Sequence, residues 1–150
     1  LGNWLEKNTP KDTVLAIHSV GAIPFYAKRK TIDMWGLNDK VIARTPVADF
    51  GKGMAGHERT NPQYVFSLQP HIYLPEDRFL VSVDHCKRNK DPYCNKMGVV
   101  LIPVEVGFPK GFLNDYTRVH IQLEGNFLNV WARKDFYEEW RKNWLIPNAN

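Results

Sequence analysis

Short apolar runs separated by turn-forming residues mark the first half of the chain. Each run is only long enough for a strand, and such bounded apolar runs are typical of buried strands. The runs predict strands over residues 13–17, 31–34 and 71–74. Between the first two, Pro24 suits the first turn of a helix over residues 22–27. A strand, a helix and a second strand in this order predict parallel pairing through a right-handed crossover.

Two further helical segments are predicted around these strands. Residues 1–7 are typical of the end of a helix, with Trp4 and Leu5 facing inward. Asp39 has a side chain that caps helices well, so we expect a short helix over residues 40–44.

A glycine-rich segment and a third helix precede the last strand of this half. Residues 49–59 predict a loop because glycine is frequent there. Thr60 or Asn61 is then expected to cap a helix that has Pro62 at its first position. Pro70 ends this helix, and its inward-facing side chains are predicted to be Tyr64, Val65 and Leu68.

The second half of the chain has a different pattern. Residues 116–123 alternate, with Val119, Ile121 and Leu123 on one face and Arg118, His120 and Gln122 on the other. A turn over residues 124–126 and a partner strand over residues 127–132 complete a hairpin. Strands are also predicted over residues 79–83 and 99–106. Residues 134–144 predict a closing helix with one aromatic stripe, formed by Phe136, Tyr137, Trp140 and Trp144.

These elements predict the fold class. We expect a small parallel β-α-β-α-β sheet in the first half, continued by antiparallel strands, a hairpin and a C-terminal helix. The 150 residues suffice for one domain with a core of its own, and neither a repeat nor an internal linker divides them. The sequence therefore predicts a single α/β domain spanning residues 1–150.

Composition and charge narrow the kinds of molecule that the chain is expected to bind. The net charge is +4, and the basic residues are scattered rather than gathered in one run, so we expect no nucleic-acid partner. They are expected either at solvated loop ends or facing an anionic surface such as lipid headgroups. No apolar stretch approaches the roughly 18 residues that span a bilayer. The chain begins at Leu1 rather than Met, which predicts a fragment or a processed form of a larger protein.

Cys86 and Cys94 lie on either side of a short polar segment. Three interpretations stay open: a disulfide that closes a small loop and implies an oxidising compartment, two free thiols, or part of a metal site with His85. The sequence offers no second Cys or His pair at ligand spacing, so no metal and no cofactor are predicted.

Two polar segments are the candidate site. In open α/β sheets ligands bind beyond the carboxyl ends of the strands, and Asp33 lies near such an end. The first segment supplies Asp33, Trp35, Gly36, Asp39 and Arg44. The second is the end of the glycine-rich loop and supplies Gly56, His57, Glu58 and Arg59. If both segments meet at one rim, their carboxylates, imidazole and glycine backbone are suited to binding sugar hydroxyls.

Structural roles explain the same residues equally well. Asp33 and Asp39 are then turn and helix caps, His57 and Glu58 brace the loop, and Trp35 packs rather than stacking on a sugar ring. Gly51, Gly53 and Gly56 fit the dinucleotide-binding spacing, but they neither follow the first strand nor open a helix. No nucleophile motif occurs, so no catalytic residue is assigned.

Beyond these chemical arguments, residues 1–75 resemble the C-terminal soluble domain of bacterial multi-spanning membrane glycosyltransferases. These are the GT-C enzymes of the protein-mannosyltransferase-like and arabinofuranosyltransferase-like type. The matching positions are Gly21, Ile23, Phe25, Tyr26, Asp33, Gly36, Leu37, Asp39, Ile42, Ala43, Arg44, Gly56, His57, Glu58, Arg59, Pro70 and Ile72. The second half of the chain matches no family pattern.

The resemblance implies a full-length protein that transfers a sugar from a polyprenyl-phosphate donor to a glycan or lipid acceptor. The reaction would take place on the extracytoplasmic face of the bacterial cytoplasmic membrane. The catalytic acidic residue of that family, its general base, belongs to an extracytoplasmic loop of the membrane part, so this periplasmic domain would help to bind acceptor or donor. Its partners would be its own transmembrane domain, the membrane surface, and the glycan or lipid-linked sugar. Arg44 or Arg59 would pair with a carrier phosphate.

Two other classes remain open from the sequence. One is a non-catalytic carbohydrate-binding or protein-interaction module, which would bind its ligand when isolated. The other is an ordinary soluble enzyme whose site has no recognised motif.

Overall fold

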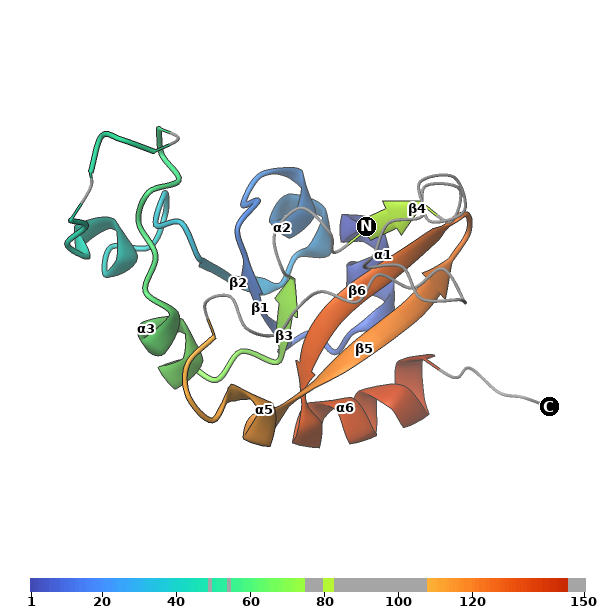
Figure 1. The fold of residues 1–150 in the computed structure, drawn as a ribbon. Helices are drawn as coiled ribbons and strands as arrows, with labels where there is room; N and C mark the ends of the chain where they lie inside the picture. Colours follow the sequence, from blue (N-terminus) through green and yellow to red (C-terminus); the bar gives the residue numbers. More distant parts are fainter. Residues whose placement is uncertain (49, 54, 75–79, 83–107, 146–150) are drawn as a thin grey trace.

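A six-stranded mixed sheet organises the chain (Figure 1). The computed structural model describes residues 1–48, 50–53, 55–74, 80–82 and 108–145. The strands are β1 (Val14–Ile17), β2 (Lys30–Asp33), β3 (Ile72–Leu74), β4 (Leu80–Ser82), β5 (Tyr116–Leu123) and β6 (Asn126–Arg133). The helices are α1 (Gly2–Asn8), α2 (Ala22–Ala27), α3 (Pro62–Ser67), α5 (Phe112–Asp115) and α6 (Lys134–Trp140), with a 3-10 turn η1 (Ile42–Arg44) and a π-helical turn η2 (Arg141–Leu145).

The sheet has a parallel and an antiparallel half, as the sequence predicts. β1 lies between β2 and β3 and is parallel to both. β6 is antiparallel to its neighbours: it pairs with β3 and β4 along one edge and with the whole of β5 along the other. The predicted α/β class is therefore confirmed.

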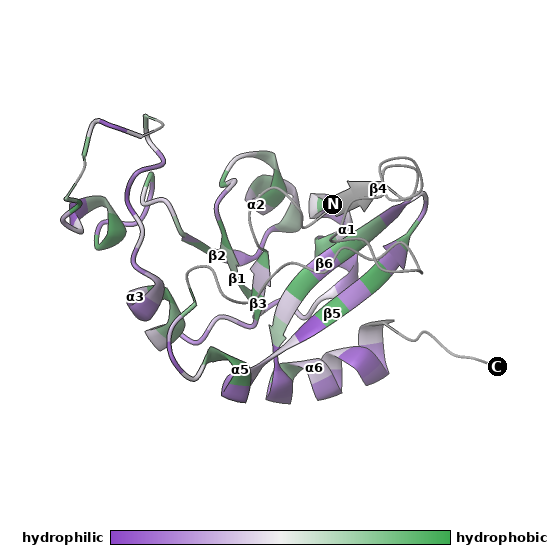
Figure 2. Cartoon of the chain, viewed as in Figure 1, coloured by the Kyte–Doolittle hydropathy of each residue, from purple (hydrophilic) through white to green (hydrophobic). Residues whose placement is uncertain are grey.

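Side chains that alternate along the strands fill two cores, one on each face of the sheet. Leu15 and Ile17 of β1 face the first core, whereas Ala16 faces the second. α1, α2 and α6 cover the first core, to which they contribute Leu5, Ala27 and Trp140. η1, α3 and α5 cover the second core, with Ile42, Val65 and Phe112. The alternating colours of β5 in Figure 2 reflect the same pattern.

The closing helix joins the two ends of the described chain. Trp140 is fully buried, and its indole Nε1 donates a hydrogen bond to the carbonyl of Asn8 at 2.5 Å. Its ring also meets the edge of Trp4, with 6.5 Å between ring centroids. The predicted aromatic stripe is confirmed, because Phe136, Tyr137 and Trp144 pack against the same core.

Several boundaries differ from the predictions. The predicted helix over residues 40–44 is only the short turn η1, and the helix over residues 134–144 ends at Trp140 and continues as η2. Leu68 is predicted to face the core but is 43% exposed. The helix α3 ends at Ser67, so Leu68 is only its C-cap residue and does not continue the buried face. Asn61 rather than Thr60 caps α3, accepting a hydrogen bond from the Tyr64 N–H. The predicted strand over residues 99–106 and the Cys86–Cys94 segment lie outside the described residues.

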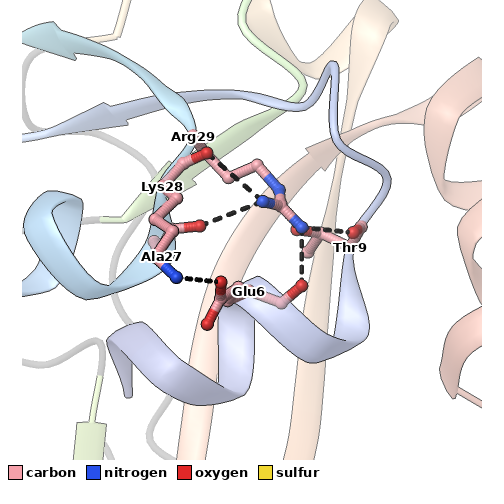
Figure 3. Close-up of polar contacts among 5 residues, drawn as sticks. All are labelled: Glu6, Thr9, Ala27, Lys28 and Arg29. Atoms are coloured by element: carbon pink, nitrogen blue, oxygen red, sulfur yellow. Dashed lines mark hydrogen bonds and ion pairs between the residues drawn. The ribbon is translucent and has the colours of Figure 1, made fainter.

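Basic side chains close the ends of helices. Arg29 is held by five hydrogen bonds, among them Nη2 to the carbonyls of Glu6 and Thr9 at the end of α1 and Nη1 to the carbonyl of Ala27 at the end of α2 (Figure 3). Lys134 donates to the carbonyls of Leu113 and Asn114 in α5. Helix carbonyls without partners favour cations in this way. Part of the basic character is therefore structural.

Residues 34–61, which we call the lobe, extend beyond the edge strand β2 and away from the sheet (Figure 1). The lobe contains η1 but no strand within its described residues. Across the described ranges of the whole chain, no helix combines the length and hydropathy needed to cross a membrane.

Candidate functional site

The first wall of the site is the turn that follows β2. Asp33 ends this strand, and its side chain is buried. Its Oδ1 accepts hydrogen bonds from the N–H groups of Trp35 at 3.0 Å and Gly36 at 3.1 Å, and its Oδ2 accepts one from Asn38 at 2.5 Å. Both carboxylate oxygens are thus committed to the turn. Asp33 shapes the site and does not offer its carboxylate to a ligand.

Gly36 allows the turn to pack tightly. Its φ of +75° favours glycine, and a Cβ at this position would lie 2.6 Å from the amide nitrogen of Ala43. The turn therefore lies directly against η1. No other residue fits here without moving the backbone.

Asp39 has a comparable role one turn further along the chain. Its Oδ1 accepts from the N–H groups of Val41 at 2.9 Å and Ile42 at 3.0 Å, at the start of η1. Its Oδ2 accepts from the Tyr64 hydroxyl at 3.3 Å. Burial, followed by the nearby Asp39 carboxylate, raises the pKa of this phenol. The predicted capping role of Asp39 is confirmed, and it links the lobe to α3.

The second wall is the glycine-rich loop, which closes around a carboxylate of its own. Glu58 Oε1 accepts hydrogen bonds from the N–H groups of Gly51 at 2.8 Å and Gly53 at 2.7 Å. A Cβ on Gly53 would lie 3.1 Å from Glu58 Cγ, so the side chain fits closely against the backbone. These N–H groups bind Glu58 instead of a nucleotide phosphate, consistent with rejecting the dinucleotide interpretation.

The two walls meet through aromatic rings. The ring of Trp35, two residues after Asp33, lies 3.8 Å from that of His57 between centroids. On the sheet side, His18 follows β1 and lies 5.0 Å from Trp35. The prediction that the two segments share a rim is therefore confirmed. His18 was missed, although its place after a buried parallel strand is a signal that could have found it.

Both segments line one pocket of about 210 Å³. Its walls are Trp35, Gly36, Leu37, Ala43, Phe50, Gly56, Glu58 and Arg59. Trp35, Gly36, Gly56, Glu58 and Arg59 were predicted as site residues. Phe50, which is 60% exposed, was missed, although a large aromatic residue in a polar glycine-rich loop is unusual enough to be noticed. Arg44 is exposed and does not line the pocket.

Arg59 is the cation of the pocket. One Nη1 hydrogen bond, 3.0 Å to the Thr45 carbonyl, fixes its head, and the guanidinium carbon lies 4.6 Å from the centroid of the Phe50 ring. Within the described ranges its other N–H groups make no hydrogen bond, and no carboxylate pairs with it. The pocket therefore combines aromatic and aliphatic walls with a positioned donor, a combination that suits a ligand with both an apolar face and polar or anionic groups.

A metal site finds no support in the described part of the chain. No group of three or more His, Cys, Asp or Glu side chains gathers there as a metal site would require. The carboxylates of Asp33, Asp39 and Glu58 mainly hold backbone N–H groups.

The fold and site define a mixed α/β domain that carries a pocket on a lobe beside the carboxyl edge of its parallel strands. The chain belongs to a family described as a domain of unknown function (DUF8728), whose model matches residues 1–141. No curated protein and no solved structure matches the chain.

Proposed function

We propose that this chain is an extracytoplasmic accessory domain of a bacterial membrane glycosyltransferase that uses a polyprenyl-phosphate-linked sugar. In this proposal the pocket between Trp35 and Arg59 binds the glycan acceptor or the lipid-linked donor, and catalysis belongs to another part of the protein. The observation that carries the proposal is the contact between Trp35 and His57. It brings together at one pocket the two segments on which the resemblance to the glycosyltransferases rests.

The chemistry of the pocket supports a sugar ligand. Flat aromatic surfaces such as Trp35 and Phe50 accommodate the C–H face of a sugar ring, while polar groups at the rim reach its hydroxyls. Arg59 has donors left for a hydroxyl or for a phosphate of a lipid-linked sugar. Arg44, the other arginine considered for a phosphate, is less suited because it lies outside the pocket lining.

The pocket lies entirely within this chain, which also favours a second candidate, a carbohydrate-binding module that works without a transferase. Both candidates require the isolated domain to bind sugar. They differ in ligand, because only the accessory domain of such a transferase needs to recognise a phosphorylated sugar.

The test is an NMR titration of the tryptophan indole N–H signals of the chain. The probes are octyl α-D-mannopyranoside, octyl α-D-arabinofuranoside and mannose 1-phosphate. We expect a saturable shift of the Trp35 signal, which Leu37→Ser weakens because Leu37 is a 60% exposed part of the pocket wall. Trp144→Phe, which changes a half-buried tryptophan outside the lobe, is the matched control and leaves the titration intact.

The result also separates the two candidates. Preferential binding of mannose 1-phosphate that Arg59→Gln removes favours the transferase domain. Binding of the neutral glycosides alone, unaffected by Arg59→Gln, favours the carbohydrate-binding module. If no probe moves the Trp35 signal, the pocket is not a site for these sugars and both candidates fail.

A further inference from the structure

The last turn of α2 presents two aromatic side chains to solvent. Phe25 is 74% exposed, the largest value among the large hydrophobic side chains of the described residues, and Tyr26 is 51% exposed. Their rings touch edge to face, with 5.1 Å between centroids. Much of α2 has hydrophobic colours in Figure 2. Exposed aromatic residues side by side on a short helix point to a surface with a binding role.

α1 packs closely against one flank of α2. A Cβ on Gly2 would lie 2.6 Å from Tyr26 Cβ and 2.8 Å from the Ile23 carbonyl oxygen, so the two helices are in direct backbone contact. Ile23 and the fully buried Ala27 occupy the inner side of α2. The network around Arg29 then fixes the ends of both helices relative to each other (Figure 3). Phe25 consequently lies on the outer side of α2, whereas Tyr26 lies beside α1 and is still 51% exposed.

Two exposed lysines, Lys28 and Lys30, follow this aromatic pair, in a segment of the sequence that is rich in basic residues. Residues 1–30 contain five basic and two acidic residues, a net charge of +3 within a chain whose net charge is +4. The basic residues are Lys7, Lys11, Lys28, Arg29 and Lys30. Lys28 comes one helical turn after Phe25 and stays 70% exposed although its Nζ pairs with Glu6 at 2.7 Å. Basic residues beside exposed aromatic rings are typical of helices that lie in the headgroup region of a membrane.

We propose that α2 docks against an anionic lipid surface. Phe25 and Tyr26 enter the boundary between headgroups and acyl chains, and the exposed Lys28 and Lys30 that follow them face anionic headgroups. α2 connects the carboxyl end of β1 to the start of β2, and Phe25 and Tyr26 lie in its last turn. The inference rests on the proposed function only in expecting a membrane nearby, and its test contains no sugar.

The test is cosedimentation of the chain with lipid vesicles. One vesicle preparation is phosphatidylcholine alone, and the other contains about 30% phosphatidylglycerol, which gives the surface potential that attracts lysines. We expect the chain to sediment with the anionic vesicles and to dissociate as salt screens the charges. The double variant Phe25→Ser/Tyr26→Ser should bind about tenfold more weakly or worse, because it removes most of the apolar area that enters the lipid.

The matched control is Leu68→Ser/Leu113→Ser, which also removes two exposed apolar side chains but lies on α5 and at the end of α3. It should bind vesicles as the unchanged chain does, and both double variants should keep the melting temperature. Trp35→Ala should also keep vesicle binding, which separates this surface from the pocket.

Three results would overturn the proposal. The first is no sedimentation of the unchanged chain with anionic vesicles, and the second is equal binding by both double variants. The third is concentration-dependent self-association in analytical ultracentrifugation that Phe25→Ser/Tyr26→Ser abolishes, because the surface would then belong to a second copy of the chain.

Discussion

The sheet and the lobe are stabilised by different means. Across the sheet, buried apolar side chains form two cores, with Leu15 and Leu128 in the first and Val65 in the second. Among the described residues of the lobe, only Gly36 and Ile42 are buried. The lobe is ordered instead by three carboxylates, those of Asp33, Asp39 and Glu58, each of which accepts hydrogen bonds from at least two backbone N–H groups.

This difference explains where the pocket lies. A core buries its aromatic faces, whereas turns that are fixed by carboxylates leave neighbouring side chains at the surface. Trp35, Phe50 and Arg59 thus remain available to a ligand although the backbone around them is fixed. We expect the lobe to open locally at a lower free energy than the sheet, as binding regions commonly do.

The largest effect is expected in the core. Trp140→Ala removes a fully buried indole together with its hydrogen bond to Asn8, and should lower the free energy of unfolding by about 3–5 kcal/mol. Urea denaturation measures this loss. Lys142→Ala, on the exposed side of the same helical segment, is the control and should change little. A loss below about 1 kcal/mol for Trp140→Ala would show that the closing helix is not part of the core.

The next largest effect is expected at the turn after β2. Asp33→Ala leaves the N–H groups of Trp35 and Asn38 without their acceptor and should cost about 2 kcal/mol, while the Gly36 N–H keeps its bond to the Asp33 carbonyl. Hydrogen exchange should accelerate most at the amides of Trp35 and Asn38. Glu124→Ala removes an exposed carboxylate from the hairpin turn and serves as the control. Unchanged exchange in Asp33→Ala would mean that this carboxylate is free for a ligand, which contradicts the structural role.

A pH-dependent effect is expected between β1 and β3. His71 Nδ1 accepts a hydrogen bond from the Val14 N–H at 2.8 Å, and burial, with the charge of Arg133 as the next cause, lowers the pKa of His71 from its ordinary 6.5. The unfolded chain therefore binds more protons than the folded one in the range below 6.5. The stabilising contribution is present above that pH and is lost as pH falls through the folded-state pKa.

His71→Asn is the variant that tests this effect, since its amide oxygen can still accept from Val14 while the side chain no longer titrates. Urea denaturation between about pH 7.5 and 5 should give a smaller loss of stability on acidification than in the unchanged chain. Some loss should persist, because burial also lowers the pKa of His120. An identical pH dependence in both proteins would exclude His71 as a cause.

The smallest effect is expected where the lobe meets α3. Tyr64→Phe removes one hydroxyl that donates to Asp39 at 3.3 Å and should cost about 0.5 kcal/mol, near the lower limit for a single hydrogen bond. Tyr137→Phe, in α6, is the control for loss of a tyrosine hydroxyl elsewhere. A cost as large as that of Asp33→Ala would mean that α3, rather than the turn, is what holds the lobe.

The sequence predicts the sheet better than it predicts the site. Period-two alternation defines β5 without error, and Pro24 places α2 at its observed bounds. The predicted burial of Leu68 was wrong, because the end of a short helix depends on tertiary packing rather than on the spacing of apolar residues.

The contact between the segments of Trp35 and His57 could be predicted, because a ligand site was expected beyond the carboxyl end of the second strand. The turn and capping bonds of Asp33 and Asp39 are local and were among the interpretations of the sequence. The contact of Phe50 with Arg59, in contrast, depends on how a loop without periodicity folds.

The central claim is that the turn after β2 and the glycine-rich loop form one pocket, with Trp35 against His57. Nuclear Overhauser spectroscopy of the chain measures this contact directly. At 3.8 Å between ring centroids, cross-peaks between the indole protons of Trp35 and the imidazole protons of His57 should be strong, and Glu58→Gln should weaken them by loosening the loop. Absence of these cross-peaks in the unchanged chain would contradict the claim.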